Sequence, residues 1–362
     1  MRRLLVVLCA AALLLPAAAQ ARSVPPGFFG VMADGVLMTR DDASFAHEFE
    51  LMKATGVETI RPVVYWADMQ PERGGPLITL SLDRLMGQAA RNGLRVVPVV
   101  LRAPEWARVQ PSNFASPPRD PQDFAAYLKA MIARYGPDGT FWAENPDVPK
   151  RPQRVWQVWN EPNLDRYWSS PKPFAKDFVA LQRVAYRAIK EADPGATVVL
   201  AGFGNDSWNA LEKAYDAGLS GRMYDVAGMH PFSGRVANVM KIVRLNRRVM
   251  NRNGDARKPI MVTEITWPSA LGTQATTTTG FETTEAGQAR KLTEAYEGFL
   301  RKRRAWRIQN VIWSTWLTSD MDSTNSFDWS GLRKLNPADP AGAPLDKPAL
   351  AAFRTLALAA QR

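Results

Sequence analysis

The chain has 362 residues, which is enough for one large domain or two ordinary ones. Its 46 lysines and arginines outnumber 35 acidic residues, for a net charge of +11, or +9 without Arg2 and Arg3. The single cysteine is Cys9, so disulfides, zinc–thiolate sites and cysteine nucleophiles are excluded for the rest of the chain.

The first 21 residues have the pattern of a secretory signal peptide. Two arginines precede an apolar run over residues 4–15, Pro16 ends the run, and residues 19–21 (Ala-Gln-Ala) offer a small-x-small cleavage site. We therefore expect cleavage before Arg22 and an exported protein, either periplasmic or extracellular. The run is too short for a transmembrane helix, and no later segment approaches about 18 apolar residues, so no membrane span is expected.

From residue 28 onward, short apolar runs alternate with longer stretches of helical period. The predicted strands cover 28–32, 57–65, 94–101, 154–160, 196–203, 223–230, 258–265 and 309–316. The predicted helices cover 42–55, 81–92, 121–135, 173–192, 207–217, 235–252, 285–303 and 346–360. Several strands are almost continuously apolar, which is typical of parallel strands buried on both faces.

Eight strands, each followed by a helix, predict a single (β/α)₈ barrel over residues 22–362. A doubly wound open sheet is the alternative, but its first strand would normally lead into a glycine-rich phosphate turn, and residues 31–35 (VMADG) are not one. The sequence shows neither an interdomain linker nor a repeat of solenoid period.

The basic run over residues 301–304 (RKRR) has two interpretations. It ends a predicted helix, where cations suit the helix dipole, or it forms a binding patch for an anionic partner. No nucleic-acid motif accompanies the run, so the helix-end interpretation is favoured and no nucleic-acid partner is expected.

In a (β/α)₈ barrel the functional side chains lie at the carboxyl ends of the strands. The ends of the predicted strands carry Arg61, Trp66, Arg102, Trp106, Asn160, Glu161, His230, Glu264, Trp267, Trp313, Trp316 and Asp320. Strands four and seven lie nearly opposite each other in such a ring. Glu161 and Glu264 are therefore predicted to face each other across its mouth.

Two facing carboxylates are what cleavage of a glycosidic bond requires. One carboxyl group must protonate the leaving oxygen, while the other stays ionised and attacks the sugar or activates water. We expect the pKa of Glu161 to be raised by burial and by the charge of Glu264. Tryptophans can cover the apolar faces of sugar rings, and asparagine and arginine can bind hydroxyl groups.

The motifs resemble clan A retaining glycoside hydrolases, especially families 39 and 5 (cellulase-like). The resemblance covers nearly the whole chain after the signal peptide and is carried by "VWNEPN", "IMVTEITWP", "IRPVVYWADMQP", "DFAAYLKAMIARYGPDGTFW", "MHPF", "GQARKLTEAY" and "GLRKLNPADPAGAPLDKPALAAF". It implies that Glu161 is the acid/base and Glu264 the nucleophile. It also implies that Asn160 binds the sugar 2-hydroxyl and that Arg61 is a partner of the nucleophile.

One position departs from the family pattern. Members often carry His-x-Tyr on strand six, with the tyrosine touching the nucleophile, whereas this chain has His230-Pro231-Phe232. Either Tyr65 or Tyr224 supplies the contact, or Arg61 and His230 alone tune Glu264.

Trp66, Trp267 and Trp316 are the predicted sugar platforms. The role of Trp313 is left undecided, because Trp313 and Trp316 are three residues apart and would face opposite sides of a regular strand. His230 either touches substrate or holds the structure, and Arg61 either belongs to the site or forms a structural ion pair. Asp165 and Asp320 either line the cleft or cap helices.

No metal ligand set and no cofactor are expected, since the chain has two histidines and lacks His-Glu-x-x-His. The sequence thus favours an exported, monomeric hydrolase acting on a carbohydrate. The alternative is a non-catalytic carbohydrate-binding barrel, for instance in exopolysaccharide handling. Such a barrel has no need to keep both glutamates and Asn160.

Overall fold

The computed structural model describes residues 22–275, 280–321 and 323–362. The predicted signal peptide lies outside this part of the chain. No helix within the described residues is both long enough and apolar enough to cross a membrane.

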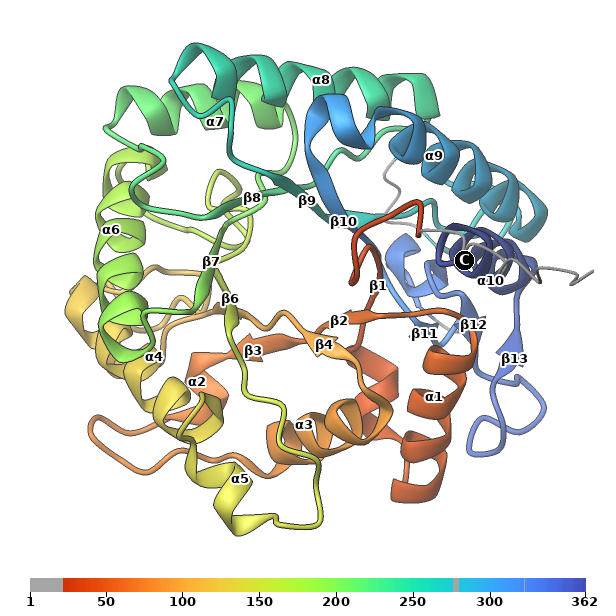
Figure 1. Cartoon of the computed structure of the whole chain (residues 1–362), viewed down its shortest axis with the longest axis horizontal. Helices are drawn as coiled ribbons and strands as arrows, with labels where there is room; N and C mark the ends of the chain where they lie inside the picture. The colour runs from red at the N-terminus through yellow and green to blue at the C-terminus, as the bar shows by residue number, and fades with distance from the viewer. Residues whose placement is uncertain (1–21, 276–279, 322) are drawn as a thin grey trace, which may run out of the picture.

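A parallel sheet curls into a ring, with helices around its outside (Figure 1). Its strands are β1 (Phe29–Met32), β2 (Thr59–Arg61), β3 (Val63–Tyr65), β4 (Arg95–Val96), β5 (Val99–Leu101), β6 (Val155–Val158), β7 (Thr197–Leu200), β8 (Val226–Met229), β9 (Ile260–Ile265) and β10 (Ile308–Trp313). They coincide with the eight predicted strands, two of which are divided in two.

Prolines cause both divisions. Pro62 separates β2 from β3, and Pro98 lies between β4 and β5. Proline has no backbone N–H to donate to the neighbouring strand, so regular pairing is interrupted at each of them. Because β2 pairs with β1 and β4, while β3 pairs with β5, the second and third strands continue the ring past the interruptions.

The remaining pairings close the ring. β5 pairs in parallel with β6, and the order continues through β7, β8, β9 and β10, which pairs with β1. The prediction of a (β/α)₈ barrel is therefore confirmed.

The eight predicted helices are all present. They are α1 (Asp42–Ala54), α3 (Leu80–Asn92), α4 (Pro121–Tyr135), α6 (Phe174–Ala192), α7 (Ser207–Asp216), α8 (Val236–Arg252), α9 (Glu285–Trp306) and α10 (Pro348–Ala360). Local sequence fixes several ends: Asp120 caps α4 with Pro121 in its first turn, and Gly93 ends α3 in the left-handed conformation. Two short helices, α2 (Trp66–Met69) and α5 (Thr140–Glu144), were not predicted.

The apolar core has two parts. The larger part packs the outer faces of the strands against the helices. The smaller part fills the barrel with side chains from five strands and from the break between β4 and β5, namely Met32, Val97, Val199, Val226, Met261 and Ile312. Such layers of inward side chains make the barrel a packed core rather than a pore.

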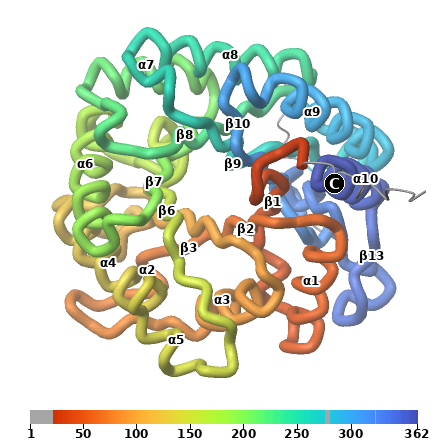
Figure 2. The backbone as a smooth tube through the Cα atoms, viewed as in Figure 1, coloured from red at the N-terminus to blue at the C-terminus, as the bar shows by residue number. Residues whose placement is uncertain are grey.

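The connection between β10 and α10 carries structure of its own. It contains a 3₁₀ turn, η3 (Ser326–Trp329), and a small sheet of β11 (Leu317–Thr318), β12 (Arg333–Lys334) and β13 (Leu345–Asp346). After it, α10 returns beside the first described residues, where Ser23 donates its backbone N–H to the carbonyl of Ala360 at 3.1 Å (Figure 2).

Candidate active site

A cleft of about 270 Å³ opens at the carboxyl ends of the barrel strands. Its lining comes from most of the strand ends and from the loops that follow them. The lining residues are Met32, Asp34, Val63, Tyr65, Val99, Leu101, Asn160, Arg166, Tyr167, Phe232, Glu264, Ser314, Asn325 and Phe327.

Arg61 organises one side of this cleft. It ends β2, its side chain is fully buried, and its Nη1 lies 2.8 Å from Oε1 of Glu264. Its Nη2 donates to Oδ1 of Asn160 at 2.8 Å, and its Nε donates to Oε1 of Gln157 at 2.7 Å. A guanidinium is suited to this arrangement because its rigid fork serves several acceptors at once. The structure thus brings the predicted Arg61, Asn160 and Glu264 together.

Glu161 follows β6 in a tightly bent backbone. Trp159 and Glu161 have φ angles of 63° and 39°, in the left-handed region that costs free energy for residues other than glycine. The backbone N–H of Glu161 donates to the carbonyl of Gly202 at 2.9 Å, which anchors the bend to the loop after β7. The strand itself therefore ends at Val158, before the predicted residue 160, and the bend then directs the glutamate.

Both carboxylate oxygens of Glu161 have donors. Oε1 lies 3.0 Å from Nδ1 of His230, and Oε2 lies 2.9 Å from Nη2 of Arg166. Glu161 and His230 are almost completely buried, whereas the side chain of Arg166 is 58% exposed. Arg166 was not predicted from the sequence, although it follows Glu161 by only five residues.

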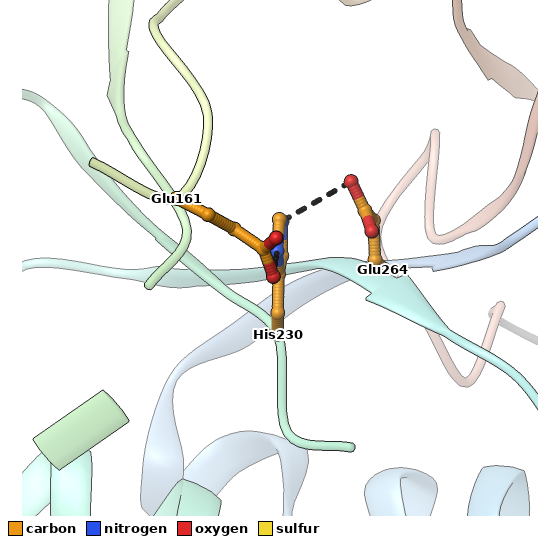
Figure 3. Close-up of side chains that lie close together, drawn as sticks. All are labelled: Glu161, His230 and Glu264. Atoms are coloured by element: carbon orange, nitrogen blue, oxygen red, sulfur yellow. Dashed lines mark hydrogen bonds and ion pairs between the residues drawn. The ribbon is translucent and has the colours of Figure 1, made fainter. Parts of the chain in front are cut away.

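His230 lies between the two glutamates (Figure 3). Its second nitrogen, Nε2, is 3.6 Å from Oε1 of Glu264 and has no hydrogen-bond partner among the described residues. Gly202 makes this position available, because a Cβ there would lie 2.3 Å from Nε2. Gly204 has a similar role, since its Cβ would lie 2.7 Å from Oε1 of Glu161.

The two carboxylates are close. One oxygen of Glu161, one oxygen of Glu264 and a ring nitrogen of His230 all lie within 4.8 Å of one another. Carboxyl groups of inverting glycosidases are separated by about 6.5–9.5 Å, and those of retaining enzymes by about 5–5.5 Å. The spacing of Glu161 and Glu264 is therefore nearer to that of retaining enzymes than to that of inverting ones.

The expected rise in the pKa of Glu161 is wrong for this conformation. Burial raises the pKa of Glu161, but the hydrogen bond and charge of His230, followed by the charge of Arg166, outweigh burial and hold it below its usual value. The expected rise rested on burial and on the charge of Glu264, whereas the contacts of His230 and Arg166 with this carboxylate were not foreseen. The contacts of His230 and Arg166 thus stabilise the ionised form of Glu161.

A third acidic side chain, Asp34, was also missed. It follows β1, it lines the cleft, and its Oδ1 accepts a hydrogen bond from Oγ1 of Thr315 at 3.0 Å. Burial, opposed by the Thr315 hydrogen bond and reinforced by the charge of Glu264, raises the pKa of Asp34 to about 6. The rule that predicted the other site residues also applies to Asp34, because it stands at the end of the first strand.

The three tryptophans predicted as platforms are not at the cleft surface. Trp66, Trp267 and Trp316 are fully buried, and none of them lines the cleft. Trp66 packs on Tyr127, Trp267 donates to the carbonyl of Ser233, and Trp316 donates to the carboxylate of Glu48. The prediction is corrected for a physical reason: a side chain at a strand end can point into the cleft or behind it, and these indoles fill the space behind it.

The other residues whose role the sequence left undecided do not line the cleft. Trp313 is fully buried 6.3 Å from the ring of Trp267. Asp320 pairs with the buried Lys347 at 2.9 Å, and Asp165 is exposed outside the cleft lining.

Smaller aromatic side chains line the cleft instead. Phe232 stacks on Phe281 with ring centroids 5.8 Å apart, and Phe327 packs edge-on against both. Tyr65, the last residue of β3, and Tyr167, on the loop after β6, also line the opening. These rings provide the apolar surface that the tryptophans were expected to supply.

Among the described residues, no tyrosine takes the place of the one that family members carry at the position of Phe232. The hydroxyl of Tyr224 bonds to Tyr215 and to Asp255, away from the cleft. Tyr65 lines the cleft without a hydrogen bond to Glu264 among the described contacts. Glu264 is contacted by Arg61 and His230, which is the second of the two alternatives raised by the sequence.

Glu161, His230 and Glu264 have donor atoms of the kinds that divalent cations bind. Each glutamate already faces a guanidinium, from Arg166 and Arg61 respectively. A cation would have to displace or lie beside these positive charges, so the donor set fits a metal poorly. That no metal is needed stays a prediction.

Fold and cleft together define a (β/α)₈ barrel with paired carboxylates at the mouth, and solved structures share this fold. A family 39 glycoside hydrolase from Bacteroides cellulosilyticus superposes with a TM-score of 0.64 at 19% identity, over 94% of this chain and 65% of that one. A family 39 β-xylosidase from Caulobacter crescentus gives 0.62 at 18% identity, over 94% and 73%. A family 5 protein from Bifidobacterium longum gives 0.60 at 14% identity, over 92% and 78%.

The similarity establishes that this chain has the barrel fold of clan A glycoside hydrolases, as its motifs indicated. It spans about two thirds of the length of the Bacteroides protein. No family model and no curated sequence matches the chain.

Proposed function

We propose that the protein is a glycoside hydrolase that cleaves O-glycosidic bonds, of β configuration, in a polysaccharide or oligosaccharide. The observation that carries this proposal is the approach of Glu161 and Glu264 to within 4.8 Å at the mouth of the barrel. Their position in a cleft lined by aromatic rings suits a sugar, whose apolar face stacks on a ring while its hydroxyls meet polar groups. The signal-peptide pattern supports action outside the cytoplasm.

Glu264 is proposed as the nucleophile. Arg61 lies 2.8 Å from its Oε1, and this ion pair fixes the direction of the carboxylate. Attack by the other oxygen on the anomeric carbon would form a glycosyl–enzyme bond and release the leaving group, so the configuration would be retained after hydrolysis.

Glu161 is proposed as the acid that protonates the leaving oxygen and then as the base that activates water. Asn160 accepts from Arg61 through its Oδ1, which leaves its amide N–H groups for a sugar hydroxyl in the cleft. His230 is buried between the two carboxylates and contacts Oε1 of Glu161 through its Nδ1, so we assign it the role of a positioning residue.

One observation favours the second candidate function, a carbohydrate-binding barrel without catalysis. Arg166 and His230 occupy both oxygens of Glu161, and an acid catalyst needs one of them free to carry its proton. The two functions differ in whether the contact with Arg166 is released when a sugar binds.

The test is a screen of the purified protein against β-glucans, xylans, mannans and bacterial exopolysaccharides, with products identified by mass spectrometry. Proton NMR of the first product anomer then reports retention or inversion. Glu264→Gln is the control for contaminating hydrolases. Binding of a polysaccharide with no product above that control would support the carbohydrate-binding barrel instead.

A further inference from the structure

Arg166 is the removable partner of Glu161. His230 cannot easily leave, because its side chain is completely buried, whereas the guanidinium of Arg166 comes from an exposed loop position. Under the proposed function, proton donation requires Arg166 to give up the oxygen that it holds at 2.9 Å. Something in the bound substrate must therefore offer the guanidinium a better partner.

A second arginine lies at the neighbouring strand end. Arg102 follows β5, which pairs with β6, and its guanidinium lies over the rings of Tyr65 and Phe114 at 4.1 and 4.8 Å. No carboxylate among the described residues lies within ion-pair distance of it. The ring of Tyr65 lines the same cleft as Arg166, and Phe114 is 57% exposed. Arg102 is thus a cation stacked on a ring that lines the cleft, without an ion-pair partner in the part of the chain that the structure describes.

The charges of the cleft are divided between two sides. Arg102 and Arg166 stand after β5 and β6, on the side of Glu161. Asp34 follows β1 and Glu264 lies on β9, in the opposite half of the ring, where Arg61 already pairs with Glu264. Arg61 is committed to Glu264, so an anionic group of a ligand is attracted to Arg166 and Arg102 on the side of Glu161. Since Glu161 is the proposed acid, the arginine side is the side of the leaving group.

We propose that the cleft takes an acidic glycan, in which the sugar on the leaving-group side carries a carboxylate, as a uronic acid does. This inference rests on the proposed function. The carboxylate accepts from Arg166 and Arg102, as guanidinium groups bind carboxylates through paired hydrogen bonds. In accepting, it draws Arg166 from Glu161 and leaves one oxygen of that glutamate free to hold the proton for the leaving group. Substrate recognition and release of the acid catalyst are then a single event.

The test compares glycans that differ only at C6. β-1,4-Tetraglucuronate is paired with cellotetraose, and β-1,4-tetramannuronate with mannotetraose, each titrated calorimetrically into the full chain carrying Glu264→Gln. We expect at least one acidic member to bind about tenfold or more tightly than its neutral partner, as two charge-assisted contacts allow. Adding Arg166→Gln should abolish most of that preference, and Arg102→Gln should reduce it.

Arg252→Gln is the matched control, because it removes the same charge from an exposed pair with Glu212 far from the cleft. It should leave the preference unchanged, whereas general attraction to a basic protein would respond to any of the three changes alike. Equal affinity for acidic and neutral partners, no binding of either acidic glycan, or a preference that survives Arg166→Gln would overturn the inference.

Product analysis of the same glycans with the unmodified chain separates this inference from the proposed function. If the acidic glycans bind more tightly in a way that depends on Arg166 but no product forms, the proposed binding site for acidic glycans stands and the proposed hydrolase activity is wrong. Hydrolysis of neutral glycans that is indifferent to Arg166→Gln would retain the hydrolase and reject the acidic substrate.

Discussion

Gly202 lies directly against the imidazole of His230, and a Cβ at this position would be 2.3 Å from both Cδ2 and Nε2. The backbone of Gly202 is not in the left-handed region, so alanine is excluded by this contact alone. We predict that Gly202→Ala displaces His230 from between the glutamates and lowers both activity and stability, the latter by about 1–3 kcal/mol for an overpacked buried site. Urea unfolding and kcat/KM on the best substrate of the screen measure the two effects.

Gly87→Ala is the matched control for this substitution. Gly87 lies within α3 and has ordinary space around its Cβ position, with nothing nearer than 4.0 Å. Alanine there should stabilise the protein by up to about 1 kcal/mol through helix propensity and leave activity unchanged. Full activity in Gly202→Ala would show that the position of His230 is unimportant.

Alanine substitutions of the two glutamates are predicted to impair different steps of the reaction. Glu264→Ala removes the proposed nucleophile, so turnover of every substrate should fall, on the order of 10⁴-fold or more. Glu161→Ala removes the proton donor of the first step and the base of the second. An aryl glycoside with a good leaving group should therefore still form the glycosyl–enzyme, which then accumulates because no base activates water. Azide should rescue both variants, with inversion for Glu264→Ala and retention for Glu161→Ala. Equal losses on activated and natural substrates, without rescue, would contradict these roles.

Arg166→Gln should change the pH dependence of kcat/KM on a neutral substrate. The positive charge of Arg166 stabilises ionised Glu161, so its removal raises the pKa of Glu161 and keeps the acid protonated to higher pH. The basic limb should therefore move to higher pH, by a modest amount because the side chain of Arg166 is more than half exposed to solvent. A downward shift, or the same shift in Arg252→Gln, would contradict the assignment.

Asp34→Asn should alter the dependence of stability on pH. The pKa of Asp34 is raised from 3.8 to about 6 in the folded protein, so the folded state binds this proton more tightly than the unfolded state. Its contribution therefore favours folding below pH 4 and is lost as the pH rises through about 6. Asparagine keeps the acceptor for Thr315 without the charge, so the variant should gain stability relative to the parent as the pH rises.

Calorimetric melting of both proteins at pH 4.5 and 7.5 measures this difference. The exposed Asp165, replaced by asparagine, is the control and should show no comparable change between the two pH values. A gap in melting temperature that stays constant with pH would mean that Asp34 does not titrate in this range.

The ring of strands was predictable because apolar runs and helical periods alternate so regularly. The interruptions of β2–β3 and β4–β5 were not predicted, although Pro62 and Pro98 stand in the sequence. The small sheet β11–β12–β13 could not be predicted, because strands of two residues are too short to show an alternation of apolar and polar residues.

Within the site, a strand-end rule brought together Arg61, Asn160, His230 and the two glutamates. The same rule misplaced Trp267 and Trp316, since it gives the height of a side chain along the barrel and not the direction in which it points. Arg166 lies on a loop whose path depends on tertiary contacts. The contacts of His230 and Arg166 with the carboxylate of Glu161, which lower its pKa, were both missing from the prediction, so the direction of the shift was wrong.

The burial of the large tryptophans has a spectroscopic consequence. Trp66, Trp156, Trp159, Trp267, Trp313 and Trp316 are at most 1% exposed, so their emission should be blue-shifted and well protected from acrylamide quenching. None of them lines the cleft, where the aromatic groups are tyrosine and phenylalanine. Intrinsic fluorescence should therefore report unfolding of the barrel with a large red shift, while a sugar entering the cleft leaves the emission maximum almost unchanged.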